Sequence, residues 1–227
     1  MTTFPGSPRL LKGAIVGIDL FNPLASVILF QYNPDRLTRS VGTQQAAPTP
    51  AAAAAAAPNR TEVLRLKGPP KETISLEIEV DAADQLEKSD PIATTLGVHP
   101  TLASLEMLLY PKAALMIANE ILAEFGVIEV IAPEAPLTLF VWGIKRVLPV
   151  RITGFTINEL FFDTDLNPIR ASVSLSMQVL TYQDLGLASV GGALFMAHQV
   201  TKEVMATIGG LSNVSSLAGS ASFEIGV

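Results

Sequence analysis

Cysteine is absent from this chain of 227 residues, and histidine occurs only twice, at His99 and His198. Without thiols the chain can form neither a disulfide framework nor a thiolate metal site, which fits a reducing compartment. Two histidines far apart in the sequence leave only carboxylates for a transition-metal site, and that is a weak ligand set. The sequence therefore predicts no metal site and no cofactor. Side-chain packing is expected to stabilise the fold.

Charge is also scarce. Charged residues make up 16% of the chain and hydrophobic residues 49%, with a formal net charge of -6. The mean hydropathy is +0.42 and the isoelectric point about 4.9. No stretch gathers Lys and Arg on one face, so nucleic acid is not an expected partner. High hydropathy with little charge predicts apolar surface that a partner protein covers.

Long apolar runs are missing as well. The longest, 187–197 and 127–132, fall short of the roughly 20 residues that a helix needs to cross a bilayer. Residues 1–9 are rich in Pro and Gly and lack the pattern of a secretory signal. We therefore expect neither a membrane-spanning helix nor a secretory signal.

Sequence signatures of catalysis are not found. The pairs Gly191-Gly192 and Gly209-Gly210 lack the residues of a phosphate-binding loop, and no Gly-x-Ser-x-Gly motif occurs. Asp163 with Asp165, and Glu77 with Glu79, are carboxylate pairs of the kind that hydrolyse glycosides. The first pair is better explained by a turn and the second by a solvated strand face. The sequence predicts a protein that is not an enzyme, with no catalytic residue.

The hydrophobic pattern is mainly that of β-strands. Residues 72–81 alternate strictly, and a row of polar side chains that includes Glu77, Glu79 and Asp81 is expected to face water or a lumen. The turn at Asn22-Pro23 predicts a hairpin between the first two strands. The expected strands cover 12–19, 25–32, 63–67, 72–81, 137–142, 146–159 and 169–182.

Helical periodicity is confined to three segments, 100–110, 112–125 and 193–208, and the tail 209–227 is expected to be loosely ordered. Residues 43–60 form a low-complexity loop rich in Ala and Pro. We predict one domain over 1–184 and a Gly/Ala-rich appendage over 185–227. This appendage docks either on a neighbouring protein or on the core of its own chain.

Three groups of motifs resemble the tube-type baseplate proteins of contractile injection systems, which are relatives of phage tail baseplate hub proteins. Taken in order, the motifs extend from residue 12 to about residue 182. The third group is the most specific and contains Phe-Val-Trp-Gly at 140–143. The matching segments are 12–14 with 27–40; 68–76 with 84–86 and 97–106; and 140–143 with 146–153, 159–162 and 166–171.

The resemblance implies an antiparallel phage-tail-tube-like barrel or sandwich with a flanking helix, in a fold that is mainly β with one or two helices. It implies a structural hub or inner-tube adaptor whose copies close a ring, expected to be hexameric. The implied partners are a spike (VgrG-like) protein, the inner tube protein and the baseplate wedge proteins. The implied location is the bacterial cytoplasm, in an assembled particle that lysis can release. Many relatives end in a LysM-like module, which residues 185–227 do not show.

Six side chains are candidates for the interfaces of such a ring. The planar guanidinium group of an arginine can pair with a carboxylate of an adjacent subunit. Trp142 offers a large apolar surface for an interface or for the core. Phe140 is expected in the core. Two other functions stay open, a monomeric ligand-binding β-protein and a carboxylate-dependent hydrolase. The interface candidates are Arg36, Arg39, Trp142, Arg146, Arg151 and Arg170.

Overall fold

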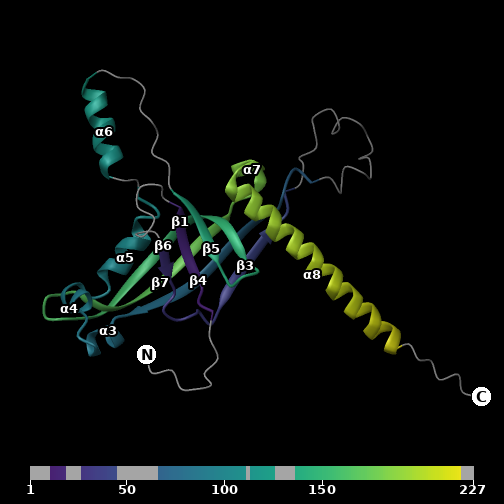
Figure 1. Ribbon diagram of the computed structural model, residues 1–227, viewed down its shortest axis with the longest axis horizontal. Coiled ribbons are helices and arrows are strands. Elements are labelled where there is room, and N and C mark those ends of the chain that lie inside the picture. Colours follow the sequence, from purple (N-terminus) through teal and green to yellow (C-terminus); the bar gives the residue numbers. More distant parts are fainter. Residues whose placement is uncertain (1–10, 19–26, 45–65, 111–112, 126–135, 221–227) are drawn as a thin grey trace, which may run out of the picture.

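Seven strands pair into one antiparallel sheet in the order β2-β1-β5-β6-β7-β4-β3, with helices beside it (Figure 1). This computed structural model describes residues 11–18, 27–44, 66–110, 113–125 and 136–220. The architecture confirms the predicted class, mainly β with antiparallel strands and a few helices. The strands are β1 (Ala14–Ile18), β2 (Val27–Leu29), β3 (Leu37–Gly42), β4 (Lys71–Asp81), β5 (Leu137–Val141), β6 (Val147–Phe162) and β7 (Pro168–Val179).

The helices include three that the periodicity predicted, α5, α6 and α8, and three short ones that it did not. The short helices have too few turns to produce a recognisable apolar stripe. Thr181 caps α7, so the segment 180–182, which was expected to end a strand, instead turns into a helix. The helices are α3 (Ala83–Glu87), α4 (Pro91–Leu96), α5 (His99–Glu106), α6 (Ala113–Glu124), α7 (Tyr182–Leu185) and α8 (Val190–Ser220).

Most of the strand predictions are confirmed, but the strand predicted over 25–32 is found only at Val27–Leu29, and residues 66–67 of the strand predicted over 63–67 contain only an isolated bridge at Leu66. β1 and β2 form the expected hairpin, with Ile15 opposite Ile28. β3 was not predicted, because its side chains are exposed almost throughout and show no alternation. Residues 63–65 of the predicted strand at 63–67, and residues 45–60 of the predicted loop, lie outside the described residues.

One hydrophobic core covers one face of the sheet. Alternate residues of β4 and β7, such as Ile74 and Met177, are buried and lie opposite each other in the register. The helices α4 and α5 contribute further buried side chains, including Ala93 and Leu105. Phe140 is fully buried at the middle of this core, as expected from the sequence.

The sheet curls until its two edges approach each other. β2 and β3 are opposite edge strands, yet only residues 30–36 separate them in the chain. Gln31, two residues after β2, accepts a hydrogen bond of 2.8 Å from the N–H of Asp81, at the end of β4. Because β4 lies next to the far edge, the seven strands enclose the core as a partly closed barrel.

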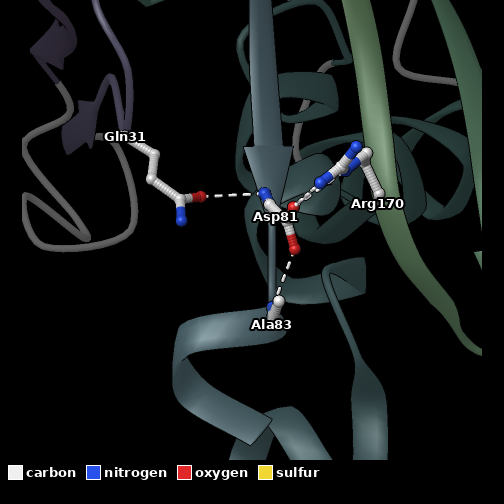
Figure 2. Close-up of polar contacts among 4 residues, drawn as sticks. All are labelled: Gln31, Asp81, Ala83 and Arg170. Carbon is white, nitrogen blue, oxygen red and sulfur yellow. Dashed lines mark hydrogen bonds and ion pairs between the residues drawn. The ribbon is translucent and has the colours of Figure 1, made fainter. Parts of the chain in front are cut away.

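Asp81 joins three parts of the fold (Figure 2). Its carboxylate accepts from the N–H of Ala83 at the start of α3, at 2.7 Å, and from Nε of Arg170 on β7, at 2.8 Å. The sequence placed Asp81 in the solvated row with Glu77 and Glu79, but its side chain is buried. The prediction was wrong for Asp81 because β4 ends there and the chain turns into α3, so the carboxylate faces Arg170 and the helix.

Helix α8 is longer than the sequence predicted. It runs without interruption from Val190 to Ser220, so the expectation of a loosely ordered tail was wrong over 209–220. The Gly209-Gly210 pair weakens a helix by about 1 kcal/mol per residue but does not break it, since no proline follows. The first turns pack on the sheet through Phe195, and the rest of the helix extends away from it (Figure 1).

A testable contact holds the turn between α4 and α5 against β7. Gly97 has φ +57°, and a Cβ there would lie 2.2 Å from the carbonyl oxygen of Pro168. We expect Gly97→Ala to lower the free energy of unfolding, measured by urea denaturation, by about 3 kcal/mol.

Gly143 is the matched control for Gly97, because its φ is +73° but a Cβ would meet no atom within 4 Å. Gly143→Ala is expected to cost only about 1 kcal/mol, from the backbone alone. Equal losses in the two variants would contradict a steric role for Pro168.

Candidate functional site

Three of the six interface candidates come together in one pocket. Arg39 of β3, and Trp142 and Arg146 at the turn between β5 and β6, line a cavity of 370 Å³ against α8. The helix contributes one face, since its residues follow the spacing i, i+3, i+4 and i+7. We call this the basic pocket; its lining residues are Arg39, Trp142, Lys145, Arg146, His198, Thr201, Lys202 and Met205.

The charge at the edge of the basic pocket is organised by Glu72, which is only 5% exposed. One carboxylate oxygen accepts from Arg39, with N to O distances of 2.6 and 2.7 Å, and the other lies 3.3 Å from Nζ of Lys202. Burial raises the pKa of Glu72, but the hydrogen bond from Arg39 and the charge of Lys202 outweigh it, so the pKa lies below its ordinary value of 4.5. Glu72 thus stays ionised and links β3, β4 and α8.

Arg146 and His198 lie beside this network without joining it. The guanidinium of Arg146 makes no hydrogen bond or ion pair with another described residue, and burial with the nearby charge of Arg39 lowers its pKa. His198 is 9% exposed, and neither ring nitrogen makes a well-formed hydrogen bond within the described part of the chain. Burial and the charge of Lys202 lower the pKa of His198 below 6.5, although a weak hydrogen-bonding contact with the main chain of Lys145, which falls short of hydrogen-bond geometry, raises it.

Trp142 forms the apolar wall of the basic pocket. Its indole stacks on Phe140, with ring centroids 5.8 Å apart, and lies 6.4 Å from the ring of Phe30. It is partly exposed, so it belongs to the edge of the core and to the pocket at the same time. The two roles that the sequence left open for Trp142 are therefore compatible.

The other three candidates lie elsewhere. Arg170 pairs with Asp81 within the chain and also lies over the ring of Phe161, 5.9 Å from its centroid. Arg151 is exposed on β6, with Nη2 3.3 Å from Oε1 of Gln178. Arg36 lines a separate shallow hollow that also contains Glu77 and Glu79.

Sequence reasoning missed Glu72, Lys145, His198 and Lys202 as members of one site. A signal existed for Glu72, because it has the same parity on β4 as Ile74 and Leu76, and a carboxylate on a buried face needs a cation. No signal in the sequence could bring β3, the β5–β6 turn and α8 together, since that depends on how far the sheet curls.

Three elements extend from the sheet (Figure 1), and each of them carries exposed apolar side chains. At the tip of the β6–β7 hairpin, Phe161 is 68% exposed and has a φ of 54°, which is unfavourable for a residue with a Cβ. On α6 and just beyond it, Ile117 and Phe125 are exposed, the latter by 81%. On α8, the exposed apolar residues include Val200, Val204, Met205, Ile208, Leu211 and Val214.

No group of three His, Asp or Glu side chains in the described residues is placed to hold a metal ion. No helix within the described ranges combines the length and the hydropathy needed to cross a bilayer.

Glu72→Gln should destabilise the fold, because it leaves Arg39 and Lys202 without their anion. We expect a loss of about 1 to 3 kcal/mol in the free energy of unfolding at neutral pH, measured with urea. The folded-state pKa of Glu72 is depressed, so its contribution is complete above pH 4.5 and is lost as the pH falls through the folded-state pKa. The difference between wild type and variant should therefore shrink in acid.

Glu77→Gln is the control for Glu72, since Glu77 is exposed on the same strand and an amide still accepts from Ser172. We expect a change within about 0.5 kcal/mol. A Glu72→Gln variant as stable as this control would contradict the central role of the Glu72 carboxylate.

Stability should also fall as the pH drops below 6.5, because the unfolded chain takes up a proton on His198 more readily than the folded chain does. The charged groups around the ring are Lys145, Arg146 and Lys202, with Glu72, which stays ionised in this range. His198→Gln should remove this pH dependence and His99→Gln should keep it, as measured by urea denaturation across the range. A slope that survives His198→Gln would assign it to another group.

No protein-family model matches the chain. A search of curated proteins also found no match. The resemblance to contractile injection baseplate proteins therefore stays a hypothesis from the motifs of this sequence.

Proposed function

We propose that this chain is a structural subunit, not an enzyme, that assembles into a ring in the baseplate of a contractile injection particle. The ring, expected to be hexameric, joins the spike to the inner tube and contacts the wedge. It assembles in the bacterial cytoplasm and leaves the cell with the particle on lysis. Its function is geometric, with binding energy spread over large interfaces.

The observation that carries the proposal is the exposed apolar surface on the β6–β7 hairpin, α6 and α8. A soluble monomer exposes few contiguous apolar patches, and larger ones mark sites of protein interaction. Phe161 adds a specific point, because a bulky apolar residue at positive φ, two-thirds exposed, has no evident benefit for an isolated chain. A partner that buries its ring would account for both features.

The open edges of the sheet favour a ring over a single pairwise contact. β2 and β3 each leave one side unpaired among the described strands, and β3 is exposed along nearly its whole length. Unpaired strand edges recruit further strands, and closed symmetry covers such edges. In a ring, one edge of each copy faces the next copy, and the hairpin and helices remain for the layers above and below.

Phe161→Asn tests the role of the hairpin tip. Asparagine tolerates positive φ, so the isolated chain should unfold at the same or a higher urea concentration than wild type. Assembly, measured by sedimentation velocity of the purified chain and of the chain co-expressed with spike and tube proteins, should weaken by roughly tenfold or more.

Leu187→Asn is the control, because it removes another exposed apolar side chain, from the segment between α7 and α8. It should leave assembly unchanged. Electron microscopy of the co-expressed proteins should show rings between spike and tube. A chain that stays monomeric with and without these proteins at high concentration would instead favour a monomeric ligand-binding β-protein.

A further inference from the structure

The basic pocket concentrates positive charge in a chain that is acidic as a whole. Four cationic side chains, Arg39, Lys145, Arg146 and Lys202, line it, whereas the chain has a formal net charge of -6. Glu72 neutralises part of this charge through Arg39 and Lys202. Arg146 and Lys145 have no ion-pair partner among the described residues, so two positive charges stay uncompensated at the β5–β6 turn.

His198 is a second and independent sign of a missing ligand. A buried polar side chain is normally hydrogen-bonded, because an unpaired one costs about 1 to 3 kcal/mol. His198 is only 9% exposed and lines the basic pocket, yet neither ring nitrogen has a partner with hydrogen-bond geometry in the described part of the chain, and the main chain of Lys145 makes only a weak contact with the ring. A ligand group with oxygen atoms would supply what the ring lacks.

The walls of the basic pocket also suit a small anionic group. Its volume of 370 Å³ is within the range of small-molecule sites, roughly 300 to 1,000 Å³. Trp142 and Met205 make part of the wall apolar, and a low-dielectric wall strengthens the attraction between ions. The planar fork of an arginine binds a carboxylate with two parallel hydrogen bonds.

We propose that the basic pocket is an oxyanion site that takes a carboxylate group, held by the guanidinium of Arg146 and the ring N–H of His198, with Lys145 at its mouth. The carboxylate belongs either to a free small molecule or to an acidic side chain of a second polypeptide, including a second copy of this chain. The site does not depend on the proposed ring, since a single chain contains all of its residues.

Trp142 provides the measurement, because it is the single tryptophan of the chain and lines the basic pocket. Citrate should change its fluorescence in a saturable way, compared with sodium chloride at matched ionic strength. Arg146→Gln should weaken the affinity for citrate by roughly tenfold or more, and Arg146→Lys by less, since the charge remains while the fork is lost. Urea denaturation of each variant checks that it is folded.

Arg151→Gln is the matched control, because it removes an exposed arginine of β6 outside the basic pocket. It should bind citrate as wild type does. An unsaturated response, or one that is the same in the Arg146 and Arg151 variants, would overturn the proposal and show an effect of ionic strength alone.

Sedimentation velocity of the wild-type chain, with and without citrate, distinguishes a carboxylate of a second copy of the chain from one of another source. If citrate competes with an acidic side chain of a second copy, larger species should dissociate, and Arg146→Gln should dissociate them without citrate. If citrate binds and the sedimentation does not change, the carboxylate comes from a free molecule or another protein. Both results support the site. The fluorescence titration tests citrate binding to a single chain, so its result does not depend on whether the chain forms a ring.

Discussion

A single buried carboxylate, that of Glu72 on β4, links the edge strand β3 to helix α8. It lies on the apolar face of β4, where a charge is stable only if cations reach it. Those cations come from the edge strand β3 and from α8, two elements distant in sequence. The curl of the sheet, the position of α8 and the shape of the basic pocket are therefore coupled through one side chain. Asp81 has a similar position at the other end of β4, between Arg170 and the start of α3.

This arrangement divides the molecule into a well-packed body and three extensions. The body encloses its apolar side chains between the curled sheet and the helices α4 and α5. The hairpin tip, α6 and the outer part of α8 instead present apolar side chains to solvent. The polar network sits where the body meets α8. A partner that binds α8 would thus act next to the cluster of Glu72, Arg146 and His198.

Much of the fold could be predicted from the sequence, because side-chain alternation is a local property. The strands β4 and β7 alternate clearly enough to be placed, and Asn22-Pro23 predicts the first hairpin. β3 could not be found, since an exposed edge strand needs no apolar pattern. The prediction of a loosely ordered tail was wrong over 209–220, because glycine lowers helix propensity without preventing a helix. The basic pocket could not be predicted from the sequence, since only the curvature of the sheet brings Arg39 and Arg146 together. The sequence nevertheless predicts Arg39, Trp142 and Arg146 as candidate interface residues.

The pairing of β4 with β7 has a consequence for the speed of folding. These neighbours are far apart in the chain, and the Asp81–Arg170 contact closes a loop of 89 residues. By contrast, β5, β6 and β7 join consecutive segments through short turns. Loop closure costs more entropy as the loop grows, and non-local sheets form slowly for this reason. We expect the β5–β6–β7 meander to form early and β4 to add later, bringing Glu72 and the edge strand β3 with it. Until then the unpaired edge of β7 is exposed, which makes the interval before β4 docks the stage of folding at which this chain is most prone to aggregate.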